Sequence, residues 1–146
     1  MYYLQQYGLD ILHSYRGKGY ELDIYIPSLK IAIEYDGYYW HKHRTNNDLE
    51  KNYKCKNDGI KLYRIREGIS PLNDSSIDYV VLENQKNLSK VLEEILSEII
   101  GTSIDVDIER DIVAIESLRV FTEKEDPLFF TMRKWQKNGI MKKTAT

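Results

Sequence analysis

Residues 20–41 read YELDIYIPSLKIAIEYDGYYWH, and this stretch decides the fold of the chain. Apolar and polar side chains alternate along residues 20–26 and again along residues 30–36, as is typical of β-strands with one buried face. Pro27 lies between the two runs and belongs in a turn, because it cannot donate a hydrogen bond to a strand ladder. The pattern therefore predicts a β-hairpin.

Acidic side chains gather on this hairpin. Asp23 lies on its first strand, and Glu34 and Asp36 lie on its second strand, followed closely by Gly37 and His41. Two acids at positions i and i+2 of a strand share one face at a separation of about 7 Å, and a cross-strand neighbour approaches to about 5 Å. Carboxylates this close repel each other unless a cation lies between them, and oxygen ligands suit Mg²⁺. We therefore expect a Mg²⁺ or Mn²⁺ site here; the plainer alternative is that the acids are exposed to solvent at the strand ends.

The remaining pattern predicts a sheet covered by helices, which is an α/β fold. Strands are expected at residues 9–15, 60–67 and 78–82, and helices at residues 48–57, 87–100 and 105–121. Residues 1–7 are too short to assign, and the last turns of a helix that ends at Gly8 are one option. Apolar side chains at helical spacing favour the helix over 87–100, and Gly101 follows it as a C-cap. In the helix over 48–57 we expect Leu49 and Tyr53, with Cys55 or Lys56, to face inward.

Length and composition favour a single globular domain. The chain has 146 residues and a formal net charge of −2, so it lacks the overall basic charge of a typical DNA-binding protein, although a local patch can supply that charge. Cys55 is the only cysteine, which excludes an internal disulfide, and no structural zinc is expected. Without a signal peptide or a long apolar run, we expect a cytoplasmic protein with no membrane contact.

Several of these residues together resemble one family. Residues 33–41 (IEYDGYYWH), with Asp23 before them and residues 60–67 (IKLYRIRE) after them, resemble the Vsr-like branch of the PD-(D/E)xK restriction-endonuclease fold, which includes the very short patch repair and homing-type endonucleases. The resemblance covers about residues 9–67. It implies a restriction-endonuclease-like mixed β-sheet flanked by α-helices. It also implies a Mg²⁺-dependent endonuclease that hydrolyses DNA phosphodiester bonds, by nicking or by double-strand cleavage.

The resemblance also implies roles for single residues. Asp23 resembles the strand aspartate that ligates Mg²⁺, and Tyr35 stands where the family can offer a backbone carbonyl to the metal. Glu34 matches the second acid of the wider fold's pattern, and Asp36 stands where that pattern has its lysine. His41 resembles the histidine that helps to activate the attacking water.

This arrangement predicts metal-assisted phosphodiester hydrolysis. Mg²⁺ held by Asp23 and Asp36, with Glu34 as a further candidate ligand, would lower the pKa of a bound water, and His41 would take the proton of that water. The residues expected to contact nucleic acid are Trp40, His43, Lys51, Arg64 and Arg66. Simpler interpretations stay open: His41 as a structural loop histidine, Asp48 and Lys51 as an ion pair on one helix face, and Arg64 and Arg66 as partners of surface acids.

Residues 1–125 are expected to form the endonuclease domain, and residues 126–146 a weakly structured tail. Within the tail, residues 135–139 (WQKNG) are similar to the lead-in of a small zinc-binding module that often follows such nucleases. The family also draws an acid from a helix before the first strand, and residues 1–7 contain no Asp or Glu. That departure favours an alternative, a catalytically impaired nuclease-fold module that binds nucleic acid or blocks a protein partner. DNA is the expected partner, and a homodimer or a protein partner stays open.

Overall fold

The structure is a computed structural model that describes residues 1–17 and 19–122, with the side chains of residues 39–40 and 118–122 outside the description as well. The strands are β1 (Leu12–Arg16), β2 (Glu21–Ile26), β3 (Ile31–Gly37), β4 (Lys61–Glu67) and β5 (Ile77–Val81), and the helices are α1 (Tyr2–Gln5), α2 (Tyr38–His41), α3 (Thr45–Asn57), α4 (Leu88–Ile100) and α5 (Ile108–Thr122). The predicted tail over 126–146, with its WQKNG sequence, lies outside the described residues.

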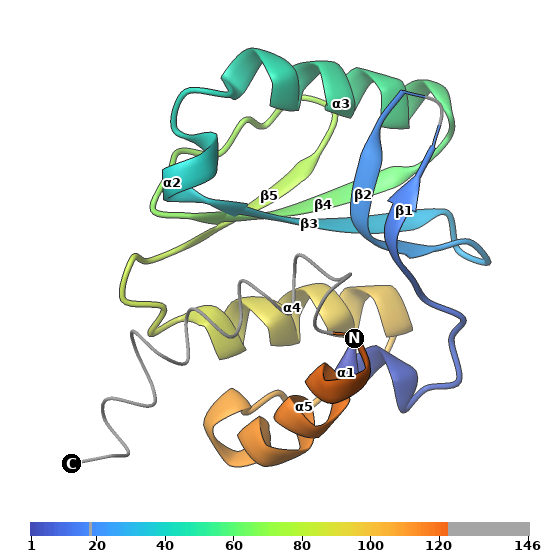
Figure 1. Cartoon of the computed structure of the whole chain (residues 1–146), viewed down its shortest axis with the longest axis vertical. Coiled ribbons are helices and arrows are strands. Elements are labelled where there is room, and N and C mark those ends of the chain that lie inside the picture. Colours follow the sequence, from blue (N-terminus) through green and yellow to red (C-terminus); the bar gives the residue numbers. More distant parts are fainter. Residues whose placement is uncertain (18, 123–146) are drawn as a thin grey trace.

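The strands form one mixed sheet in the order β1-β2-β3-β4-β5. The pairs β1/β2 and β2/β3 are antiparallel, whereas β3/β4 and β4/β5 are parallel. A parallel pair needs a crossover, and α3 supplies the crossover from β3 to β4. Figure 1 shows three layers, with α3 on one face of the sheet and α4, α1 and α5 on the other. The predicted α/β class, a mixed sheet covered by helices, is confirmed.

Most elements lie close to their predicted positions. The hairpin of β2 and β3 is confirmed, with Pro27 in the turn between them. The helix α4 ends at Gly101, which has the left-handed φ of 83° that favours glycine at a helix C-cap. Residues 38–41, which had no predicted structure of their own, form the short helix α2.

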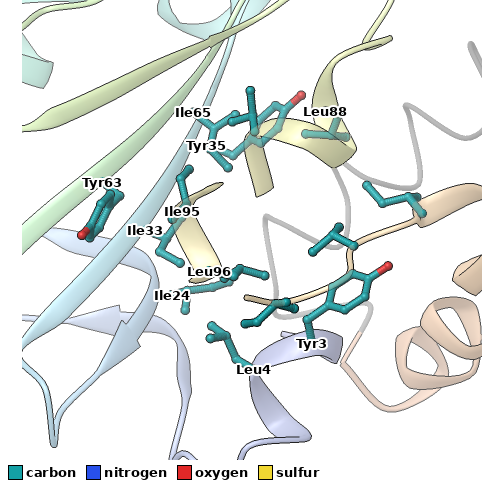
Figure 2. Packing of buried hydrophobic residues seen from close by; sticks show 14 of the residues in the cluster. Tyr3, Leu4, Ile24, Ile33, Tyr35, Tyr63, Ile65, Leu88, Ile95 and Leu96 are labelled. Atoms are coloured by element: carbon teal, nitrogen blue, oxygen red, sulfur yellow. The ribbon is translucent and has the colours of Figure 1, made fainter. Parts of the chain in front are cut away.

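One face of the sheet carries the main apolar core. Figure 2 shows side chains from the sheet, from α1 and from α4 packed together on this face. The buried members that it labels are Tyr3, Leu4, Ile24, Ile33, Tyr35, Tyr63, Ile65, Leu88, Ile95 and Leu96. Burial of apolar surface is the dominant favourable contribution to folding, and this is the larger of the two apolar clusters in the described residues.

The other face, under α3, combines buried charged side chains with a smaller apolar cluster, which consists of Leu22, Tyr25, Ala32, Cys55, Ile60 and Leu62. The buried side chains of α3 belong to Asp48, Asn52 and Cys55, whereas Tyr53 is 50% exposed. The prediction that Tyr53 faces inward was therefore wrong, and the inward position of Cys55 is confirmed. The strands below one part of α3 present charged side chains to it, so Asp48 and Asn52 turn inward to pair with them. Cys55 instead packs in the smaller apolar cluster. None of the helices in the described part of the chain has the length and apolar character needed to cross a bilayer.

Candidate functional site

Charged side chains from two neighbouring strands meet under α3. In the β3/β4 register, Glu34 lies beside Arg64, and Asp36 lies beside Arg66. Because alternate residues of a strand point to the same face, all of these side chains lie on the face that α3 covers. The chain then turns through α2 into α3, which brings His41 and Asp48 over the end of β3.

The first of two groups is the Asp36 cluster, which consists of Asp36, His41, Asp48, Arg64 and Arg66. The Asp36 side chain is fully buried, and Nη1 of Arg64 donates to both of its carboxylate oxygens at 2.9 Å. Nη1 of Arg66 donates to Oδ2 of Asp36 at 2.9 Å and to Oδ2 of Asp48 at 3.1 Å. Each buried acid therefore has a guanidinium partner, as buried charges require.

His41 completes this cluster. Its Nδ1 lies 3.0 Å from Oδ2 of Asp48 and 3.6 Å from Oδ1 of Asp36. The possible ligand atoms of His41, Asp36 and Asp48 all lie within 4.8 Å of one another, which is close enough to hold a metal ion. Burial acts to raise the pKa of Asp48, but the hydrogen bond and charge of His41 and the charge of Arg64 outweigh it and hold the pKa below its ordinary value.

The second group is the Asp23 cluster, which consists of Asp23, Glu34 and Lys51. The backbone pairing of β2 with β3 runs only as far as Ile24 and Ile33. Beyond that point side chains replace the ladder: the Asp23 N–H donates to Oε1 of Glu34, and the Tyr35 N–H donates to Oδ2 of Asp23, both at 2.9 Å. Nζ of Lys51 donates to Oε2 of Glu34 at 3.1 Å.

The two acids of the Asp23 cluster repel each other in a buried setting. Burial, together with the charge of Glu34, raises the pKa of Asp23 well above its ordinary value. Burial also raises the pKa of Glu34, although the positive charge of Lys51 opposes that rise. Both shifts mean that the folded protein tolerates these negative charges poorly unless a further cation approaches.

The predicted site residues fall into these two clusters, and not into a single one. Asp36 and His41 come together as expected, but Asp23 pairs with Glu34 and is not among the residues that bring ligand atoms within 4.8 Å in the described part of the chain. The Tyr35 N–H is the backbone group that contacts Asp23. The prediction that Asp23 and Asp36 share one ion stays a prediction.

Asp48 was missed as a member of the site. The simpler interpretation, an ion pair between Asp48 and Lys51 on one helix face, was wrong: Lys51 binds Glu34, while Asp48 binds Arg66. Both residues point to the sheet, and each meets a different strand. The available signal was the spacing of Asp48, Asn52 and Cys55, a polar and small row at helical intervals on a helix with few apolar residues.

The residues expected to contact nucleic acid lie at different depths. Arg64 is fully buried and Arg66 is nearly so, so their guanidinium groups face Asp36 and not solvent. Lys51 is partly exposed, and His43 is exposed in the segment after α2. The Trp40 side chain lies outside the described residues.

Comparisons of the chain with family models, with curated proteins and with solved structures returned no match. The site is therefore interpreted from its own geometry and chemistry.

Proposed function

We propose that this protein is a metal-dependent DNA endonuclease of the restriction-endonuclease-like, Vsr-like type. The observation that carries the proposal is the buried convergence of Asp36, His41 and Asp48 at the end of β3. Taking an ion out of water costs several kcal/mol, and a buried ion pair is often no more stabilising than apolar residues of similar size. A buried charged network of this kind is typical of functional sites.

The donor set fits a hard divalent cation. Carboxylate oxygens are the preferred ligands of Mg²⁺, and Mn²⁺ also accepts imidazole nitrogen. Within the described residues, Oδ1 of Asp36 accepts a hydrogen bond only from Arg64, so it retains a lone pair for a further ligand.

The charge balance favours a cation beside the Asp23 cluster, since the acids of the Asp36 cluster already have guanidinium partners. Arg64 and Arg66 balance Asp36 and Asp48. In the Asp23 cluster, two acids face one lysine, so negative charge is in excess when both acids are ionised. A further cation at or near these acids would offset that excess.

The residues of this chain would divide the chemistry between them. A divalent ion held by Asp36 and Asp48, with Asp23 and Glu34 nearby as further acids, would polarise a phosphodiester and lower the pKa of a bound water. Because Nδ1 of His41 faces Asp48, its Nε2 is the atom that would accept the proton of the attacking water. Lys51 would balance negative charge that develops on the phosphate.

The test is a plasmid-nicking assay with Mg²⁺ and with Mn²⁺. We expect cleavage that depends on the divalent ion, and His41→Ala is expected to lower the rate by roughly 10²–10⁴-fold, the usual contribution of a general base. Asp36→Asn is expected to lower the cleavage rate at least as much, because it removes the negative charge of a metal ligand. Glu50→Gln is the matched control, since Glu50 lies on the same helix as Asp48 but is exposed and pairs only with Lys54 among the described residues.

A second candidate function is a nuclease-fold module that binds nucleic acid without cutting it, or that blocks a protein partner. The observation that favours it is the occupation of the Asp36 carboxylate by two guanidinium groups. If this second function is correct, no divalent ion supports nicking. A gel shift then distinguishes a module that binds nucleic acid from one that blocks a protein partner. Binding at low salt indicates a nucleic-acid binder, because phosphate contacts are strongest there, and its absence leaves a protein partner.

A further inference from the structure

The connection between β4 and β5, residues 68–76, contacts the Asp36 cluster on the side of its arginines that faces away from the acids. Figure 1 shows this segment running alongside α3 before it enters β5. Nε of Arg66 donates to the backbone carbonyl of Ser70 at 3.0 Å. The same guanidinium group donates from Nη1 to Asp36 and Asp48. The loop therefore fixes the side of Arg66 that faces away from the acids.

The loop also holds Arg64, through Asn52 of α3. Nε of Arg64 donates to Oδ1 of Asn52 at 2.8 Å. The amide nitrogen of Asn52 in turn donates to the carbonyl of Asp74 at 2.7 Å and to Oγ of Ser76 at 2.9 Å. Asn52 is fully buried, and both of its amide hydrogens go to the loop. Asn52 is thus a positioning residue, because it links the position of the loop to the position of Arg64.

The loop has a defined conformation of its own. Asp78, at the start of β5, accepts hydrogen bonds from the backbone N–H of Asn73 at 3.3 Å and from the hydroxyl of Ser76 at 2.6 Å. Asn73 and Ser75 have positive φ angles of 51° and 61°, a region that non-glycine residues enter at a cost. A conformation that costs free energy and is held by side-chain hydrogen bonds can be loosened by removing one of them.

We infer that residues 68–76 act as a clamp that holds both guanidinium groups on Asp36 and Asp48 and thereby sets the affinity of these acids for a divalent cation. The cation part of the inference rests on the proposed function. The two guanidinium groups and a divalent cation compete for the negative charge of the same carboxylates, so a looser clamp favours the cation. By linkage, a bound cation must loosen the clamp by the same factor.

The experiment loosens the loop without touching an arginine or an acid of the cluster. Ser76→Ala removes the hydroxyl that accepts from Asn52, and Asp78→Ala removes the support of the loop from the side of β5. Ser28→Ala is the control, because Ser28 is exposed in the turn between β2 and β3. Circular dichroism verifies that each variant is folded.

Two readouts are measured on the full chain. The first, without metal, is the hydrogen-exchange rate of the Nε–H groups of Arg64 and Arg66 by NMR. We expect a roughly two- to tenfold increase for both arginines, the equivalent of one net hydrogen bond. The second is Mn²⁺ binding by calorimetry, which we expect to tighten by a factor of the same order. Ser28→Ala should change neither.

The outcomes separate the clamp from the proposed function. Unchanged exchange rates in both loop variants would overturn the clamp, whatever the metal does. Faster exchange with an unchanged Mn²⁺ affinity would overturn the competition between arginine and cation. If wild-type protein binds no Mn²⁺, the metal site fails and the regulation of that site fails with it, while the exchange rates still report whether the loop holds the arginines.

Discussion

Towards the C-terminal end of strand β3, its two faces carry opposite kinds of buried side chain. Ile33 and Tyr35 point to α4 and join the apolar core, whereas Glu34 and Asp36 point to α3 and are just as deeply buried. Apolar burial contributes roughly 25 cal/mol per Å², but buried ion pairs come close to no net gain. The α3 face has its own smaller apolar cluster around Ala32 and Leu62, so the difference concerns the end of β3 that carries Glu34 and Asp36. There the α4 side contributes apolar burial, whereas the α3 side is constrained by the pairing of its charges.

The largest effect is expected from removing one partner of a charge pair on the α3 face. Arg64→Ala should lower the free energy of unfolding by about 3–5 kcal/mol, because it leaves Asp36 buried with less compensation. Urea denaturation measures this change. The matched variant Arg64→Met with Asp36→Leu should recover most of the loss, since it removes both charges together. If the double variant is no more stable than the single one, the charges of this face contribute to stability and the comparison of the two faces does not hold.

On the apolar face, Ile95→Ala should lower the free energy of unfolding by about 2–5 kcal/mol, the usual cost of a cavity in a core. Ile95 of α4 is completely buried, while Val113 of α5 is 74% exposed. Val113→Ala therefore serves as the control and should change stability by less than about 0.5 kcal/mol. Mn²⁺ affinity measured in native conditions should be the same in both variants, because neither residue touches the charged face.

Tyr35→Phe tests the boundary between the faces. The Tyr35 hydroxyl donates to Glu67 at 2.8 Å and accepts from Gln85 at 3.1 Å, and burial followed by the charge of Glu67 raises its pKa above the usual range. Loss of the hydroxyl leaves buried Gln85 without this acceptor and should cost about 1–2 kcal/mol in thermal or urea denaturation. Nicking activity should not change, since the side chain points away from Asp36. A loss of activity would show that the two faces are coupled.

The sequence predicted the apolar face better than the charged one for a physical reason. The alternation in residues 20–36 and the spacing of apolar residues in α4 are local patterns, and they fix which side chains face the core. The partners of charged residues are set by tertiary contacts instead. Asp48 and Lys51 were close enough in sequence to suggest one ion pair, yet they meet Arg66 and Glu34 on different strands. The buried positions of Arg64 and Arg66 likewise depend on strand pairing with β3, which no local pattern in 60–67 reveals.

The smallest effect is expected from Asp23→Asn, and it has the opposite sign. Burial and the charge of Glu34 raise the pKa of Asp23 from its ordinary value of 3.8, so the folded protein binds this proton more tightly than the unfolded chain does. The stability of the wild type therefore falls as the pH rises from about 3.8 toward the raised pKa. A neutral asparagine removes that decline, and its side-chain oxygen can still accept from the Tyr35 N–H. At neutral pH the variant should be more stable than the wild type, and the gain should shrink as the pH approaches 4.

The same substitution should abolish nicking if Asp23 belongs to the metal site, so the variant is expected to be more stable and less active. Residues that function requires are often not those that stability would select. Denaturation curves across the pH range test the first half, with exposed Asp10→Asn as the control. If the curves of stability against pH for wild type and Asp23→Asn are parallel, the folded protein does not destabilise the ionised Asp23 carboxylate. An active Asp23→Asn variant would place the site at Asp36, His41 and Asp48 alone, because only the Asp36 cluster brings acid and imidazole ligands within reach of one ion in the described residues.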